Sequence, residues 1–422
     1  MSSYSGSVCS RHSCRLITDI HEAALAGCPS AGGLPRIFFN TRKEVRSKLG
    51  DFLAVPTDIT RPASSYASSL TSAASSQESA LEDDFDASYH NFSKTSHMCI
   101  LDPKYTVFVS RFGHGSLVYR IHNKVAVVAG DPLCDPAQTN ALFDEFRLFN
   151  GNKRMKIIHY AASAAFSEYA QTQGCVVMNF ARERILNPVT NNLCESKSGK
   201  RIASQCRKLL DPKREGIQVG IYAPGLSEHD PTLEEEMQTV YDNWRTKRDS
   251  EENASSAQTF ITQYDLFARP EITIYLYTWG PDGRINGVAG LRCLGANNGF
   301  QLDPCIASED APRGITDLLV VVSTQLLKQS GITYLSLGVE PFESLHELSG
   351  QTGLWAHLTK KSYRRLMTTV AVDGKRSYYD KFRPDDEQAG NLYIILPKGT
   401  FHIREMMALM QIANISLGRL FT

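Results

Sequence analysis

The pattern of apolar and polar positions becomes regular at about residue 106. Runs rich in Val, Phe and Tyr predict strands at 106–110, 117–122, 125–129, 157–160, 176–180 and 217–222. Apolar residues at three- and four-residue spacing predict helices at 137–149, 164–172, 198–210 and 232–245. In the first of these helices, Leu142, Phe143 and Phe146 fall on one face, which is typical of a helix packed against a sheet.

The same succession recurs after an acidic, serine-containing stretch at 249–256, which predicts a linker. Strands are predicted at 272–277, 287–293, 334–338 and 393–396, and helices at 315–329, at 344–348 and from about 401 onward. Two successive strand–strand–helix–strand units predict an α/β (α+β) protein with lobes at 96–248 and 249–422. No residue-level repeat accompanies them, so this duplication depends on the order of elements alone.

Residues 1–95 have a different composition. The stretch 61–80 contains eight serines, and Glu82–Asp86 adds an acidic cluster. Such a composition buries too little apolar surface to offset the entropy of ordering the chain. We therefore expect residues 1–95 to be a largely flexible N-terminal region.

Composition narrows the class of protein. The 422 residues are 42% hydrophobic, which is typical of a globular chain, and 45 Lys+Arg balance 45 Asp+Glu. Because the net charge is zero, any RNA contact must come from local basic patches. Ten cysteines contain no C-x-x-C pair, so we expect no metal site and a reducing compartment. No apolar run reaches the roughly 18 residues needed to span a bilayer, so we expect a soluble chain or one on a membrane surface.

Four motifs occur in a fixed order. Gly130-Asp131-Pro132 follows a predicted strand, and Asp303 precedes a helix that opens with Ala311-Pro312-Arg313-Gly314. Leu335–Pro341 ends the next strand, and Tyr379-Asp380-Lys381-Phe382-Arg383-Pro384 precedes the last strand. The order and spacing of these motifs, over about residues 96–398, resemble the catalytic domain of the bacterial phosphatidylglycerol lysyltransferases.

That resemblance implies two fused acetyltransferase-like (GNAT-type) lobes and aminoacyl-tRNA as the donor. The donor is an activated ester, so the implied reaction needs neither a metal nor another cofactor. The fungal stand-alone members, which esterify the 3β-hydroxyl of ergosterol with glycine, are the most similar. They imply glycyl-tRNA, a sterol acceptor and a cytoplasmic protein that is free or peripheral on the endoplasmic reticulum or lipid droplets. Phosphatidylglycerol, or another phospholipid or lipid acceptor, remains open.

The transfer sets its own chemical requirements. The acceptor hydroxyl must lie close to the ester carbonyl, and a side chain must take its proton. Cations must hold the acceptor end of the tRNA, since phosphates dominate its affinity. Seven cations between residues 197 and 214 are candidates, with Arg201, Arg207 and Lys208 as the predicted tRNA contacts. The alternative is a solvated helix face. Lys360, Lys361, Arg364 and Arg365 form a second basic patch.

Further donor contacts are implied by the resemblance. Arg182 and Glu183 lie where the family handles the aminoacyl donor, although Asn179 replaces the family's lysine. A surface ion pair is the alternative. Lys381 and Arg383 belong to the C-terminal motif and are expected to hold the terminal adenosine phosphates, with a structural ion pair as the alternative.

Asp303, Arg313 and Asp317 are the predicted catalytic residues. Asp303 matches the family's aspartate and would orient the α-amino group or accept the hydroxyl proton. The arginine that the family carries three residues later is absent, and Arg313 is the candidate replacement. Asp303 is alternatively a turn residue before Pro304, and Asp317 alternatively stabilises a helix N-terminus.

Two other functions and one structural question remain open. A CoA-dependent N-acyltransferase would need a glycine-rich turn at a helix start, and 284–289 matches such a turn only partly. A non-catalytic module that binds tRNA or lipid is the second alternative. The apolar stretch 403–421 is either a core helix of the second lobe or a segment on a lipid surface.

Overall fold

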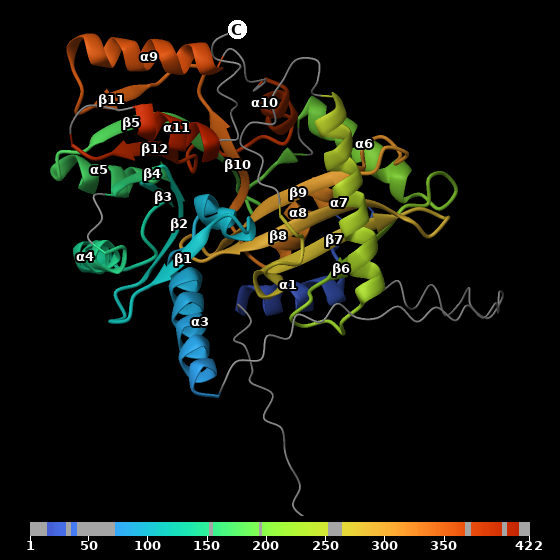
Figure 1. Ribbon diagram of the computed structural model, residues 1–422. Helices are drawn as coiled ribbons and strands as arrows, with labels where there is room; N and C mark the ends of the chain where they lie inside the picture. The colour runs from blue at the N-terminus through green and yellow to red at the C-terminus, as the bar shows by residue number, and fades with distance from the viewer. Residues whose placement is uncertain are drawn as a thin grey trace, which may run out of the picture.

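A computed structural model of the chain describes residues 15–30, 35–39, 72–151, 155–193, 196–251, 264–367, 373–398 and 403–412. Its central feature is one mixed sheet that passes through both halves of the chain (Figure 1). Within these residues the strand order is β1-β2-β3-β4-β12-β5-β10-β9-β8-β7-β6, and β11 pairs with β5.

Most strands coincide with apolar runs that the sequence predicted. They are β1 Thr106–Val109, β2 Ser116–His122, β3 Val125–Ala129, β4 Lys156–Ala162, β5 Val176–Leu186, β6 Gln218–Tyr222, β7 Thr273–Trp279, β8 Ile285–Leu294, β9 Gly299–Ala307, β10 Leu335–Pro341, β11 Glu347–Ser349 and β12 Asn391–Leu396. β9 was not predicted as a strand. The predicted helix at 344–348 is wrong, because this segment supplies β11, whose Glu347 pairs with Asn179 of β5.

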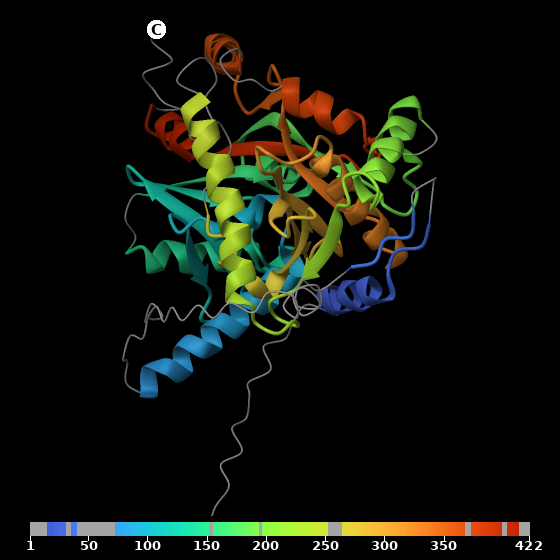
Figure 2. The same ribbon diagram turned by 90° about the vertical axis from the view of Figure 1, so that its right-hand side faces the viewer.

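The helices surround this sheet. They are α1 Arg15–Ala26, α3 Ser72–Phe92, α4 Thr139–Phe149, α5 Ala164–Thr172, α6 Lys197–Leu210, α7 Pro231–Glu251, α8 Ile315–Gln329, α9 Gly353–Met367, α10 Asp373–Asp380 and α11 Ile403–Ile412. Among the described residues, short 3-10 helices lie at η1 Thr95–Leu101, η2 Pro136–Gln138 and η4 Pro270–Ile272. In Figure 1, α7 crosses in front of β7–β9, and Figure 2 shows α8, α6 and α1 on the opposite side of these strands.

The core is continuous around the second-half strands. Every residue of β7 is buried, and α8 buries nine residues, among them Leu318, Leu319 and Val322. These side chains belong to one core cluster with those of β8 and β9. Their burial stabilises this part of the fold, because hydrophobic burial is the main favourable term in folding. The predicted α/β (α+β) class is confirmed, with one mixed sheet that runs through both halves of the chain.

Two parts of the N-terminal region are ordered, which corrects the expectation of flexibility for them. Ile17, Ile20 and Ala24 of α1 are buried against the core, as are Phe85 and Tyr89 of α3. Both sets recur at three or four residues, so each forms one apolar helix face. α3 lies partly in the serine-rich stretch, which obscures its apolar face, whereas α1 contains no serine. Residues 1–14, 31–34 and 40–71 lie outside the described residues.

Some strands pair with strands from the other predicted lobe. β6 precedes the predicted boundary at residue 248, yet it pairs with β7 at the far edge of the sheet. β12, near the C-terminus, lies between β4 and β5. The described part of the C-terminal stretch follows it: Ala408 and Leu409 of α11 pack into the cluster formed by β3, β4, β5 and β12. This helix is therefore a core element, but of the first-half strands and not of the second lobe.

Candidate functional site

β9 and β10 run parallel but diverge after a short contact. They pair only at Leu335 with Phe300 and at Ser336 with Gln301. Beyond this point β9 continues beside β8 as far as Ala307, whereas β10 continues beside β5 as far as Pro341. We call this divergence the β9–β10 fork. Because it lies at the C-terminal ends of two parallel strands joined by α8, it is a place where an α/β sheet commonly binds ligands.

Asp303 and Cys305 lie on the β9 arm of the fork. Asp303 is half-buried, and its Oδ2 accepts a hydrogen bond from the Tyr264 hydroxyl at 2.7 Å. Among the described residues, no donor is bonded to its Oδ1. Since Asp303 lies within a strand, it is not a turn residue, which corrects that alternative. Burial raises the pKa of the Cys305 thiol to about 12, so this thiol stays protonated at neutral pH.

The first turn of α8 adds an ion pair. Lys381 Nζ lies 2.5 Å from Asp317 Oδ1, and the two side chains are 27% and 19% exposed. Lys381 Nζ also lies 3.8 Å from the centre of the Tyr378 ring, a cation–π contact. Burial raises the pKa of Tyr378 and of Tyr379, so both hydroxyls stay protonated at neutral pH. Lys381 and Asp317 are thus a pair held at the fork, and neither is an isolated charge.

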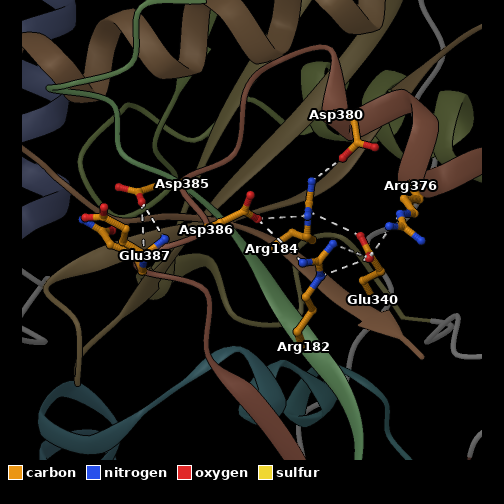
Figure 3. A network of polar contacts seen from close by, with 9 residues as sticks. Arg182, Arg184, Glu340, Arg376, Asp380, Asp385, Asp386 and Glu387 are labelled. Carbon is orange, nitrogen blue, oxygen red and sulfur yellow. Dashed lines mark hydrogen bonds and ion pairs between the residues drawn. The ribbon is translucent and has the colours of Figure 1, made fainter. Parts of the chain in front are cut away.

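An ion-pair network occupies the β10 arm (Figure 3). Arg182 and Arg184 lie on one face of β5 because they are two residues apart. Arg182 Nη2 lies 2.9 Å from Glu340 Oε1, and Arg184 Nε lies 3.3 Å from Glu340 Oε2. Arg184 also pairs with Asp380 and Asp386. The network therefore attaches the segment that carries Lys381 to the strands of the fork.

Glu183 points away from this network. It lies on the opposite face of β5, is buried, and accepts hydrogen bonds from Thr95 and Tyr334. Arg182 and Glu183 therefore do not form the surface ion pair that the sequence left open. The structure places Arg182 at the fork and Glu183 behind it, so it does not bring the two predicted donor contacts together.

The basic helix α6 lies beside the start of α8. Gln205 Nε2 donates to the backbone oxygen of Arg313 at 2.8 Å. Arg201 and Lys208 fall on the same side of α6 as Gln205, one turn away in each direction. Arg201, Lys208 and Arg313 are all exposed, so they gather around this contact. Arg207 is exposed too, but it falls on the other edge of α6.

The loop before α6 joins this surface to the C-terminal motif. Asn191 Nδ2 donates to the backbone oxygens of Phe382 and Arg383 at 2.9 and 3.2 Å. The exposed Arg383 donates from Nη1 to the backbone oxygen of Asn192 at 3.2 Å. We call Arg201, Lys208, Arg313 and Arg383 the basic rim. The basic rim adjoins the Lys381–Asp317 pair, whereas the second basic patch lies on α9, away from α6 (Figure 1).

Gly130-Asp131-Pro132 has a structural position. Asp131 accepts hydrogen bonds from the Ser163 backbone and hydroxyl at 2.8 and 2.6 Å, and it pairs with Lys94 at 2.7 Å. Burial opposes its charge, but Lys94 and Ser163 together hold the pKa of Asp131 below its ordinary value. This motif therefore fixes the start of α5 and the segment around Lys94, whose neighbour Thr95 donates to Glu183 and to Ser336 of β10.

A groove of about 710 Å³ lies on the α7 side of the molecule. Tyr241 and Tyr264 contribute to its wall, and Lys104 is the cation in its lining. Its acidic lining residues are Asp102, Glu234, Glu235, Asp242 and Asp265. Carboxylates repel phosphates, so the basic rim is the better surface for an RNA backbone.

A comparison of the sequence with protein families finds one that covers most of this structure. The model for the C-terminal domain of phosphatidylglycerol lysyltransferases matches residues 87–392. The chain belongs to this family. The match begins within α3 and ends within β12, so it includes both arms of the fork.

Relatives of this phosphatidylglycerol lysyltransferase-family chain are distant in sequence. The bifunctional lysylphosphatidylglycerol biosynthesis protein LysX of Rhodococcus jostii is 24% identical over 243 residues, 57% of this chain and 21% of LysX. The chain thus spans about a fifth of the length of that curated relative.

Solved structures of the family share the fold. The structure of L-PGS from Bacillus licheniformis is 17% identical, with a TM-score of 0.61 over 80% of this chain and 96% of that one. The C-terminal domain of an Agrobacterium fabrum protein described as a lysylphosphatidylglycerol synthetase is 16% identical, with a TM-score of 0.58 over 79% and 95%. In the described part of this family member, no helix is long and apolar enough to cross a membrane.

Several side chains at the fork were not selected from the sequence. Tyr264 donates to Asp303 and Arg292 faces it without a direct bond, while Tyr378 contacts Lys381 and Tyr379 lies near Cys305. The two adjacent tyrosines next to the C-terminal motif were a signal that could have found the second pair. Arg292 is the one charged residue in the apolar run 287–294, which was a second signal. No local signal points to Tyr264.

Proposed function

We propose that this family member is an aminoacyltransferase that moves an amino acid from aminoacyl-tRNA to a lipid hydroxyl. Family membership supports the reaction class, and the relatives named above are lysylphosphatidylglycerol proteins. The observation that carries the proposal is spatial. The basic rim lies next to the fork, whose inner wall carries Asp303 with one carboxylate oxygen open.

The arrangement fits the donor. Phosphates of the tRNA acceptor end would contact Arg201, Lys208 and Arg383, which are exposed and carry the required positive charge. The terminal ester would then reach the fork past Lys381. A lysine next to the ester oxygen stabilises the negative charge that develops there. For this role the Lys381 ammonium would move from Asp317 toward the ester. The Lys381 side chain is partly exposed, which leaves room for this movement.

The transfer balances without a cofactor. The lipid oxygen forms a bond to the ester carbonyl carbon, and the bond from that carbon to the terminal ribose oxygen breaks. The hydroxyl proton passes to Asp303 Oδ1 and from there to the ribose oxygen that leaves. Asp303 is suited to this role because Tyr264 fixes Oδ2 and leaves Oδ1 free among the described residues.

For the substrates, we propose glycine as the amino acid and the 3β-hydroxyl of ergosterol as the acceptor. Support comes from the resemblance of the four motifs to the fungal members with this activity. Phosphatidylglycerol with lysine is the second candidate, because the matched family and the curated relative are named for it. The proposed location is cytoplasmic and peripheral on a sterol-containing surface, such as the endoplasmic reticulum or lipid droplets.

The partial match to a glycine-rich turn argues against a CoA-dependent N-acyltransferase. In such an enzyme, the turn opens a helix, whose N-terminal backbone amides bind a pyrophosphate. Here the segment 284–289 leads into strand β8, which begins at Ile285, and not into a helix.

The test is a transfer assay with both substrates varied. The protein is incubated with tRNA charged with a single labelled amino acid and with vesicles that contain ergosterol or phosphatidylglycerol, and extracted lipids are analysed by mass spectrometry. We expect ergosteryl glycine and its loss in Asp303→Asn. A lysyl lipid only on phosphatidylglycerol would support the second candidate. Absence of any product with all twenty amino acids would leave a non-catalytic binding module.

A further inference from the structure

Arg292 is a charged side chain in an unusual position. It lies on β8, is 0% exposed, and its guanidinium carbon lies 4.4 Å from the centre of the Tyr264 ring. Its three side-chain nitrogens have no hydrogen-bond partner among the described residues. A fully buried cation without hydrogen bonds is costly, so its surroundings must compensate for the lost hydration.

The surroundings of Arg292 lead to Asp303. Tyr264, Asp303, Tyr275 and Tyr89 face it, and although burial opposes its charge, they raise the pKa of Arg292 above its ordinary value. Arg292 of β8 lies opposite Gln301 of β9, and Gln301 precedes Asp303 by two residues on that strand. Asp303 and Arg292 interact across space but do not form a direct ion pair.

Tyr264 connects the two charges. Its ring takes the Arg292 cation on one face, and its hydroxyl donates to Asp303 Oδ2 at 2.7 Å. Burial raises the pKa of Tyr264 well above its ordinary value, so the hydroxyl keeps its proton and its role as donor is fixed. A cation on the ring face orients the ring and withdraws electron density, which strengthens the hydroxyl as a donor.

We propose that Arg292 is a positioning residue for the transfer reaction: through Tyr264 it fixes Asp303, so that Oδ1 faces the lipid hydroxyl. The inference rests on the proposed function. Arg292 also supplies the positive charge near Asp303. The sequence analysis had proposed Arg313 for this charge. Arg313 is exposed at the start of α8, whereas Arg292 is the buried arginine that faces the carboxylate.

The test compares four variants in the transfer assay with the intact chain. Arg292→Met removes the charge, Arg292→Lys keeps it, and Tyr264→Phe removes only the hydroxyl. We expect Arg292→Met and Tyr264→Phe each to lower kcat about 10- to 100-fold, the scale of a misplaced catalytic group, with KM for charged tRNA unchanged. Arg292→Lys should restore part of kcat. Arg269→Met is the control, because it removes another arginine that stacks on an aromatic ring, that of Phe85 in α3.

Coupling to Asp303 separates positioning from a purely structural role. In an Asp303→Asn background, Arg292→Met should lower kcat no further, because the group it positions is gone. Circular dichroism checks folding, and Tyr264→Phe keeps the inference testable if Arg292→Met does not fold.

The possible outcomes have different meanings. If the wild type transfers but Tyr264→Phe and folded Arg292→Met keep full kcat, the positioning role is wrong and the proposed function stands. Equal losses in Arg292→Met and Arg269→Met would mean a structural role and would also overturn the inference. A wild type that transfers nothing contradicts the proposed function itself, and the positioning role with it.

Discussion

At the scale of single residues, the fork combines groups that differ in what they do at neutral pH. Asp303 has one oxygen bonded by Tyr264 and one oxygen free of donors in the described part of the chain. Cys305 follows on the same strand, near Asp303, Asp317 and Lys381. A thiol at this place would be an obvious nucleophile for an ester, but only the thiolate is reactive. Because the Cys305 thiol stays protonated, Asp303 and not Cys305 is the candidate reactive group.

Cys305 should be unreactive in the native protein. With its pKa raised to about 12, only roughly one thiol in ten thousand is ionised at pH 8. Iodoacetamide at pH 8 should therefore label Cys305 roughly a thousandfold more slowly in the native protein than in urea. Peptide mass spectrometry resolves this cysteine from the others. The native rate should rise with each pH unit toward pH 12, and rapid native labelling at pH 8 would contradict the assignment.

At the scale of elements, α6 sets the position of the basic rim. Its buried face carries Ile202, Cys206 and Leu209, so its cations are turned outward. Ser196 caps the helix, with its hydroxyl accepting from the Gly199 amide at 2.9 Å. The contact of Gln205 with Arg313 then decides which edge of the helix faces the fork.

The two edges of α6 should differ in tRNA binding. Arg201→Glu with Lys208→Glu reverses the edge beside Arg313, and Lys200→Glu with Arg207→Glu reverses the same charge on the other edge. We expect the first pair to weaken tRNA binding more and to reduce the salt-dependence slope by about one for each lost phosphate contact. Binding measured between low and high salt checks this. Equal effects of the two pairs would mean general attraction to RNA and would contradict the basic rim.

The start of α6 depends on Gly199. A β-carbon at this position would lie 1.5 Å from the backbone oxygen of Leu193, so the preceding loop leaves no room for a side chain. Gly199→Ala should lower the free energy of unfolding by about 2 kcal/mol or more and weaken tRNA binding. Gly225→Ala is the matched control, since nothing lies within 4 Å of its β-carbon. Urea unfolding measures both, and a Gly199→Ala variant as stable as Gly225→Ala would refute this reading.

At the scale of the whole molecule, the sheet connects the two halves of the chain. β5 comes from the first half and β10 from the second, and they pair from Leu186 with Leu335 to Ala181 with Pro341. The Arg182–Arg184–Glu340 network lies on this seam and holds the 380–386 segment against it. The fork is therefore built from both halves and needs both to be folded.

Removing Arg184 should destabilise both halves together. Its side chain is 5% exposed and that of Glu340 9% exposed, so Arg184→Met leaves a buried carboxylate with one partner fewer. We expect a loss of about 3 kcal/mol in a single unfolding transition, because the sheet is continuous. Asp386→Asn is the control: its side chain is 75% exposed, and its loss should cost less than about 0.5 kcal/mol. Two separate transitions, or equal losses, would contradict the view of one connected sheet.

The sequence by itself determined the elements and their order. Val-, Phe- and Tyr-rich runs gave most strands, and helical spacing gave α4, α6 and α8, because local periodicity reflects which face of an element is buried. The basic character of α6 and the order of the four motifs were also readable, and these motifs correctly indicated the family. The ordered face of α3 was missed because serine-rich composition obscured a short apolar stripe. That of α1 was missed because the expectation drawn from the stretch 61–80 was extended to residues 1–95.

Tertiary structure alone decided how these pieces meet. Whether β9 and β10 stay paired or diverge, and which strand lies beside β5, depends on pairings between distant segments. Tyr264 reaches Asp303 across 39 residues of sequence, and Arg292 faces it from the neighbouring strand. The pattern along a strand specifies that a face is buried but not which side chain covers it. For that reason the sequence placed the partner charge of Asp303 on Arg313, and only the folded chain showed Arg292 beside it.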